Sequence, residues 1–150
     1  MRATNVEAVY GLNSSPLYST LVQFPVACFV GTLLTDIAYL RTDLYLWESF
    51  SVWMLAVGCV FAGLAGIVGL VIFVTDSTVR AARFAWPHAL FSVAATLLAV
   101  VNAFVHSRDG YTAVVPTGLT LSCVVVLLML VATALGWRAP RGNVHLREAA

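Results

Sequence analysis

Charged residues divide the chain into four long uncharged runs. The runs cover 8–35, 49–75, 84–107 and 110–137, and the charges gather between them and towards the two chain ends. A helix needs roughly 20 apolar residues to cross the hydrocarbon core of a bilayer. Each run is long enough to cross once, and none can cross twice with a turn between. The pattern predicts transmembrane helices over 17–40, 49–74, 84–107 and 116–137.

The continuity of the runs separates this prediction from a membrane β-structure. An open sheet would expose its edges to lipid, and a barrel is built from short segments of alternating polarity. We therefore expect an all-α membrane protein, a four-transmembrane-helix bundle with up-down topology. Three regions follow: a cytoplasmic segment over 1–16, the transmembrane domain over 17–137 and a cytoplasmic tail over 138–150.

The composition agrees with a protein whose main partner is the lipid bilayer. Of the 150 residues, 61% are hydrophobic and 10% are charged, against about half and about a quarter in a soluble domain. The net charge of +1 excludes a strongly basic nucleic-acid-binding surface. We expect no cleavable signal peptide, because the first run exceeds the short apolar region of a signal.

The arginines predict the orientation, because positive residues favour the cytoplasmic side of a membrane. With four crossings, six of them share one side and two share the other: Arg2, Arg80, Arg83, Arg138, Arg141 and Arg147 against Arg41 and Arg108. Both termini are therefore expected inside. The expected location is a bacterial inner (cytoplasmic) membrane.

The second predicted helix carries a packing pattern. Gly58, Ala62 and Gly66 recur every four residues, and Gly69 follows Ala65 at the same spacing. Small residues at this spacing let two helix backbones approach closely in lipid. The pattern leaves the partner open: it is another helix of the same chain, a second copy in a homo-oligomer or a different protein.

Four polar residues inside the predicted helices are candidate site residues: Asp36, Gln23, His88 and Asn102. Asp36 lies about one turn from the end of the first helix. It is expected either to cap the bundle by reaching headgroup water or Arg41, or to handle protons or a ligand. His88 is a candidate haem ligand or proton-transfer group, against the alternative of a hydrogen bond inside the bundle. Gln23 is expected at the depth of His88, and Asn102 is expected to hydrogen-bond across helices.

The remaining side chains with metal-binding chemistry carry weaker patterns. His106 is expected at the interface, near Arg108 and Asp109, and Met129 is a soft ligand that should lie deeper than His88. The three cysteines form no Cys-x-x-Cys pair and are interpreted as small buried hydrophobes. We predict no metal site. The residues form no arrangement of nucleophile, base and acid, so no catalytic residue is predicted and the protein is not expected to be an enzyme.

Several short stretches together resemble a bacterial membrane-protein family, domain of unknown function 2231. Besides the Gly- and Ala-rich second helix, the stretches are LVQFPVA at 21–27, TDIAY at 35–39, RFAWPHA at 83–89 and VPTGL at 115–119. The resemblance covers about 15–137 and implies a compact four-helix membrane module.

The resemblance also implies where a haem would bind. Histidines of the first and third helices in this family would make a natural pair for a b-type haem. Of these, only His88 is present here, and Ser15 and Gln23 stand where the family pattern has histidines.

Three functions follow from these patterns. The first is an accessory or anchoring subunit of a membrane complex, with no catalytic activity of its own. The second is a small redox protein that binds haem b through His88. The third is a small carrier or proton-handling protein that uses Asp36.

Overall fold

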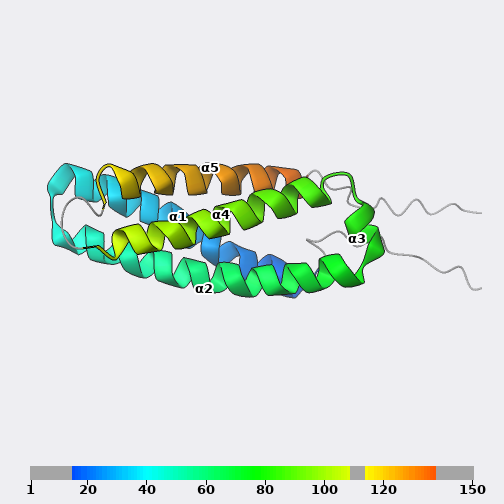
Figure 1. The fold of residues 1–150 in the computed structure, drawn as a ribbon. Coiled ribbons are helices and arrows are strands. Elements are labelled where there is room, and N and C mark those ends of the chain that lie inside the picture. The colour runs from blue at the N-terminus through cyan, green and yellow to red at the C-terminus, as the bar shows by residue number, and fades with distance from the viewer. Residues whose placement is uncertain (1–14, 109–113, 138–150) are drawn as a thin grey trace, which may run out of the picture.

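Four long helices form the body of the protein in a computed structural model that describes residues 15–108 and 114–137 (Figure 1). They are α1 (Pro16–Thr42), α2 (Tyr45–Thr75), α4 (Ala85–His106) and α5 (Thr117–Trp137), and the short α3 (Ser77–Ala81) connects α2 to α4. All four are long and apolar enough to cross a membrane. No strand occurs in the described part of the chain. The predicted all-α, four-helix membrane fold is confirmed.

The helix bounds differ from the prediction mainly at the turn between α1 and α2. Asp43 ends α1 in a left-handed conformation with a φ of 53°, and its N–H donates to the Tyr39 carbonyl. The turn is so short that α2 begins at Tyr45, four residues before the predicted start at 49. Charged residues near this turn therefore lie within helices, so the position of the charges alone placed the start of α2 too late.

At the opposite end, α3 and its flanking side chains satisfy the exposed helix termini. Asp76 Oδ1 accepts hydrogen bonds from the Thr78 hydroxyl at 2.6 Å and the Thr78 N–H at 2.8 Å. These bonds hold the pKa of Asp76 below its ordinary value. Arg80 Nη1 donates to the carbonyls of Phe73 at 3.0 Å and Val74 at 2.9 Å, which are among the unpaired acceptors at the end of α2.

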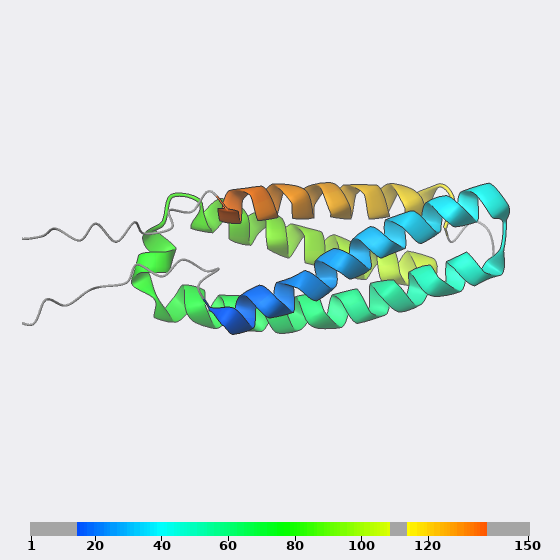
Figure 2. The same ribbon diagram turned by 180° about the vertical axis from the view of Figure 1, so that it is seen from behind.

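The four long helices pack as a ring in which α1 lies along α2 and α4 lies along α5. Contacts of α1 with α5 and of α2 with α4 close the ring, and the view from behind shows α1 crossing between α5 and α2 (Figure 2). The two ends are named below by what they carry. The turn end holds the α1–α2 turn and the start of α5, and the α3 end holds α3.

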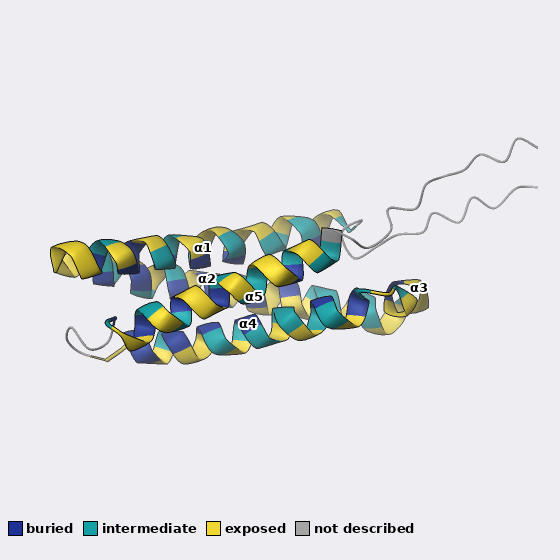
Figure 3. Ribbon diagram, turned by 90° about the horizontal axis from the view of Figure 1, so that it is seen from above, coloured by how far each residue is buried: buried dark blue, intermediate teal, exposed yellow. Residues whose placement is uncertain are grey.

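A small apolar core lies inside this ring. It consists of Phe29, Leu55, Ala62, Ala99 and Val125, contributed by all four long helices. The outward faces are exposed (Figure 3) and carry large apolar side chains such as Leu64 and Phe104. A chain that exposes such side chains on all sides needs an apolar solvent around it.

Glycines of α2 pack against α1, which answers the question of the packing partner that the sequence left open. A Cβ built on Gly58 would lie 2.5 Å from Phe29 Cε1 and 3.0 Å from Cys28 Cβ, and one built on Gly69 would lie 2.9 Å from Tyr18 Cε2. Ala62 is buried in the core. Gly66 differs from the other three, because a Cβ there would meet nothing within 4 Å.

This difference predicts opposite outcomes for two identical substitutions in α2. Gly58→Ala is expected to lower the free energy of unfolding by about 1–3 kcal/mol, because the added methyl overpacks the contact with buried Phe29. Gly66→Ala is expected to leave stability unchanged or raise it by up to about 1 kcal/mol through helix propensity. Unfolding in mixed micelles measures both. Equal effects of the two substitutions would contradict the packing of α2 on α1.

Candidate functional site

Two groups of polar side chains lie inside the bundle, one towards each end. At the turn end, the carboxylate of Asp36 in α1 is fully buried. Its Oδ1 accepts a hydrogen bond from the Ser51 hydroxyl of α2 at 2.6 Å and lies 3.0 Å from His106 Nε2 of α4. Its Oδ2 accepts from the Ser122 hydroxyl of α5 at 2.6 Å. One carboxylate therefore joins all four long helices.

Asn102 fixes the orientation of the His106 ring. The ring Nδ1 lies 3.1 Å from both the backbone carbonyl and the side-chain Oδ1 of Asn102. Both oxygens only accept, so Nδ1 carries a proton. The amide Nδ2 of Asn102 then donates a hydrogen bond to Ser122 Oγ at 2.9 Å. The Ser122 hydroxyl in turn donates a hydrogen bond to Asp36 Oδ2.

Asp36 and His106 share one further proton. A bare ring nitrogen facing a carboxylate oxygen at 3.0 Å would be repulsive, so a proton lies between Nε2 and Oδ1. On the nitrogen it makes an ion pair, and on the oxygen it makes two neutral groups. The pair has no net charge in either case, which suits a site inside a bilayer, where a single unpaired charge is costly.

Hydroxyl groups extend this polar cluster towards α1. Thr35 Oγ1 lies 2.7 Å from Ser51 Oγ and also within 3.0 Å of the carbonyls of Gly31 and Thr32. Among the described residues, no buried side-chain nitrogen or oxygen is left without a hydrogen-bond partner. A fully satisfied polar network rigidifies the surrounding structure. Asp36, Ser51, Asn102, His106 and Ser122 are called the polar cluster below.

The polar cluster differs from what the sequence led us to expect. His106, the last residue of α4, points into the bundle, with an exposed fraction of only 2%. Asp36 was expected to reach headgroup water or Arg41, whereas its fully buried carboxylate is hydrogen-bonded to His106 and two serines. The i, i+4 spacing of Asn102 and His106 on one helix face was the available signal for His106. The serines of α2 and α5 carried no signal that set them apart from other helix serines.

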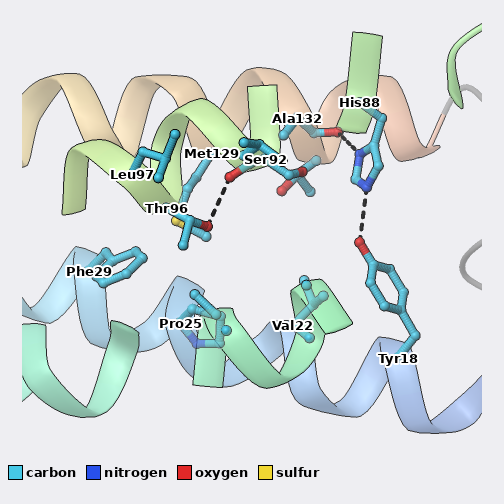
Figure 4. A pocket seen from close by; sticks show the side chains of 16 residues that line it. Tyr18, Val22, Pro25, Phe29, His88, Ser92, Thr96, Leu97, Met129 and Ala132 are labelled. Carbon is cyan, nitrogen blue, oxygen red and sulfur yellow. Dashed lines mark hydrogen bonds between the residues drawn. The ribbon is translucent and has the colours of Figure 1, made fainter. Parts of the chain in front are cut away.

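At the α3 end, His88 of α4 is buried and joins three helices. Its Nδ1 lies 2.8 Å from the backbone carbonyl of Ala132 in α5, and its Nε2 lies 3.1 Å from the hydroxyl of Tyr18 in α1. The Ala132 carbonyl only accepts, so Nδ1 donates to it. Both ring nitrogens therefore have partners, as the close-up in Figure 4 shows.

A cavity of about 220 Å³ borders this histidine. All four long helices line it, and its wall is mostly apolar, with Val22, Pro25 and Phe29 on the side of α1 (Figure 4). Exposed residues of α2 and α4 are also among the lining residues: Gly63, Gly66, Val93 and Leu97. The cavity is therefore open on the face where α2 meets α4. It is called the lateral cavity below.

The structure places the other sequence candidates as follows. Gln23 is exposed and donates to the Ser19 carbonyl within α1, so it does not meet His88. Met129 lines the lateral cavity together with His88. Cys28 and Cys59 are half-buried, Cys123 is exposed, and all three are free thiols. The described residues include no group of three metal-ligating side chains.

The residues around His88 do not fit a haem. Its Nδ1 donates to the Ala132 carbonyl, as in many metal-binding histidines, but Nε2, the nitrogen that would ligate iron, is hydrogen-bonded to the Tyr18 hydroxyl, which a haem would have to displace. The described wall of the lateral cavity offers no second histidine, and its volume of about 220 Å³ falls below the roughly 300–1,000 Å³ typical of pockets for drug-sized ligands. Haem has more than 40 non-hydrogen atoms and belongs at the large end of that range.

Comparison with known proteins places the chain in a family. No curated protein and no solved structure matches it. The family model described as "Predicted membrane protein (DUF2231)" matches residues 14–145. The match covers all four long helices and includes both the polar cluster and the lateral cavity. The chain therefore belongs to the DUF2231 family of membrane proteins.

Proposed function

We propose that the protein binds a small lipid-soluble molecule, taken from the bilayer, in the lateral cavity. The observation that carries this proposal is the cavity itself: about 220 Å³ lined by four helices, apolar over most of its wall. Its polar lining consists of the Tyr18–His88 pair and the hydroxyl residues Ser92, Thr96 and Thr133. Ligand sites in membrane and soluble bundles lie between helices and combine an apolar wall with a few placed polar groups.

The opening of the cavity supports entry from lipid. Gly63 and Gly66 on α2 leave space on the face where Val93 and Leu97 of α4 are exposed. An apolar tail can lie in this opening while a polar head reaches Tyr18 and His88. A void that stayed empty would forfeit the dispersion contacts of its lining, so an occupant of matching shape stabilises the bundle.

The polar cluster at the other end supplies a rigid frame for such a site. It joins all four helices through one carboxylate, while in the half that contains the cavity His88 joins α4 to α1 and α5. Binding sites are most exact when they rest on rigid elements. In this proposal the polar cluster has a structural role.

The wider setting of this proposal is an accessory subunit of a bacterial inner-membrane complex, with both termini in the cytoplasm. The arginine distribution supports the orientation. The scarcity of groups suited to catalysis in the described residues supports a binding role over an enzymatic one. The large apolar side chains on the outward faces are available to lipid or to a partner's transmembrane helices.

The test fills the lateral cavity and asks whether the bound molecule is lost. Protein is extracted from its native membrane directly into polymer-bounded lipid discs, and the small molecules that it retains are identified by mass spectrometry. Gly66→Leu is expected to abolish retention, because Gly66 lines the cavity and a Cβ there meets nothing within 4 Å, which leaves room for the leucine side chain to obstruct the opening. Ala56→Leu is the control, since Ala56 is exposed on the same helix away from the cavity.

The melting temperature of each variant shows whether it is folded. A molecule retained by wild-type protein and by Ala56→Leu but not by folded Gly66→Leu supports the proposal. Absence of any enriched molecule in wild-type protein contradicts it, as does equal retention by the two variants.

A further inference from the structure

The hydrogen bonds of His88 restrict what the polar end of the lateral cavity can recognise. Nδ1 lies 2.8 Å from the Ala132 carbonyl, which fixes the ring proton on that nitrogen. A second ring proton would make a buried cation. No acidic residue lines the cavity, and an unpaired charge inside a membrane is costly. The ring is therefore neutral, and Nε2 is a hydrogen-bond acceptor only.

Tyr18 supplies the donor for Nε2 in the absence of a ligand. Its hydroxyl lies 3.1 Å from Nε2 and donates to it. A hydroxyl also has lone pairs that accept. Tyr18 and His88 thus offer an arriving molecule one acceptor, at Nε2, and one rotatable group that donates and accepts, at the Tyr18 hydroxyl.

A neutral hydroxyl group can hydrogen-bond to both side chains, because it donates and accepts. Because Tyr18 and Nε2 are only 3.1 Å apart, the Tyr18 side chain must move aside to admit a ligand. A ligand hydroxyl then donates to Nε2 and accepts from the Tyr18 hydroxyl, so one hydrogen bond is replaced by two. A carbonyl or an ether accepts from Tyr18 but takes away the only donor of Nε2, which leaves a buried acceptor without a partner. Buried polar groups without partners are strongly disfavoured.

We infer that Tyr18 and His88 recognise a hydroxyl group, and that the ligand of the lateral cavity is a lipid-soluble alcohol or phenol. The inference rests on the proposed function, because it names the head group of the molecule bound there. The remaining cavity wall agrees with a neutral ligand, because its side chains carry no charge. Its other hydroxyl residues are Ser92, Thr133 and Thr96, and the Thr96 hydroxyl donates to the Ser92 carbonyl at 2.9 Å.

Three small probes with the same tail test the head group. 4-Butylphenol carries a hydroxyl, 4-butylanisole carries its methyl ether and 4-butylbenzaldehyde carries a carbonyl. Binding to the whole protein in phosphatidylcholine nanodiscs is measured as the mole fraction of probe in the bilayer that gives half-maximal stabilisation. The phenol is expected to bind on the order of tenfold more tightly than the ether or the aldehyde. 1-Octanol against its methyl ether repeats the comparison with an aliphatic hydroxyl.

Two variants separate the roles of the side chains. Tyr18→Phe is expected to keep the preference for the phenol, because Nε2 then has no other donor. His88→Leu is expected to lower phenol binding to the level of the ether. Nitrogen NMR of histidine-labelled wild-type protein gives an independent measurement: the phenol should shift the Nε2 resonance of His88 and leave Nδ1 protonated, whereas the ether should not shift Nε2 in this way.

The outcomes distinguish this inference from the proposed function. Equal binding of phenol and ether by wild-type protein overturns the inference. A preference for the phenol that persists in His88→Leu also overturns it, as does an Nε2 resonance that does not shift when the phenol is added. In those cases loss of all three probes in Gly66→Leu still upholds the cavity as a ligand site. Failure of every probe to bind wild-type protein overturns both.

Discussion

Asp36→Leu is expected to lower the free energy of unfolding by about 3–5 kcal/mol, the cost of breaking a buried charge-bearing pair by removing one partner. The substitution leaves Ser51, His106 and Ser122 without the acceptor that they share. Each is buried, and a buried polar group without a partner is costly. The effect is measured by unfolding in mixed micelles.

Asp36→Asn is expected to cost much less, about 1 kcal/mol or below. An amide nitrogen in the position of Oδ1 donates to His106 Nε2 and to Ser51 Oγ, and the amide oxygen accepts from Ser122. Ser51 can then turn its proton towards Thr35, 2.7 Å away, and Thr35 donates to the Thr32 carbonyl at 2.9 Å. The hydroxyl chain thus reverses direction with every partner retained.

The control for this pair of variants is Asp43→Asn. Asp43 is exposed and left-handed at the end of α1, a conformation that asparagine adopts readily, so no change is expected. A loss in Asp36→Asn as large as in Asp36→Leu would contradict the reversible hydroxyl chain. If Asp36→Leu unfolded with the same free energy as wild-type protein, the hydrogen bonds assigned to the polar cluster would be contradicted.

Leu55→Ala is expected to destabilise the protein by about 2–5 kcal/mol. Leu55 is 1% exposed and packs in the core with Phe29, Ala62, Ala99 and Val125. Lipid outside is as apolar as leucine, so helix association in a membrane depends on close packing, and a void in the core forfeits those contacts.

Leu64→Ala on the same helix is the matched control. Leu64 is 45% exposed on the outward face, where lipid chains fill the space that the shorter side chain leaves. We expect a change well below that of Leu55→Ala in the same unfolding measurement. A similar loss in both variants would contradict the assignment of inner and outer faces.

The fold was predictable because a bilayer constrains a chain so strongly. Backbone groups without water must bond to one another, so long uncharged runs become helices, and all four spans were predicted close to their observed bounds. The start of α2 was missed, since Glu48 lies within its first turn, where an acid suits the helix N-terminus. The short α3 was missed because one turn of helix has no periodic signal.

The candidate sites were predictable only as single residues. Asp36, His88 and Asn102 stood out because a polar side chain in an apolar run is unusual, and for the same reason Gln23 stood out, although it faces outward. Tyr18 carried no such signal, because aromatic residues are common near the ends of membrane helices, yet it supplies the partner of His88. A hydrogen bond between residues 70 positions apart leaves no trace in local spacing.

The sequence by itself therefore determined that this chain is a four-helix membrane protein. It also singled out polar residues within the helices that would be costly to expose to lipid without a hydrogen-bond partner. Only the tertiary structure decided that α2 packs on α1 through Gly58 and Gly69, that Asp36 meets His106, and that a cavity opens beside Gly66. The physical reason is the difference in range of the two effects. Transfer into lipid acts on each residue separately and is summed along the chain, whereas packing and hydrogen bonding depend on the rotation and order of the helices, which one sequence pattern leaves open.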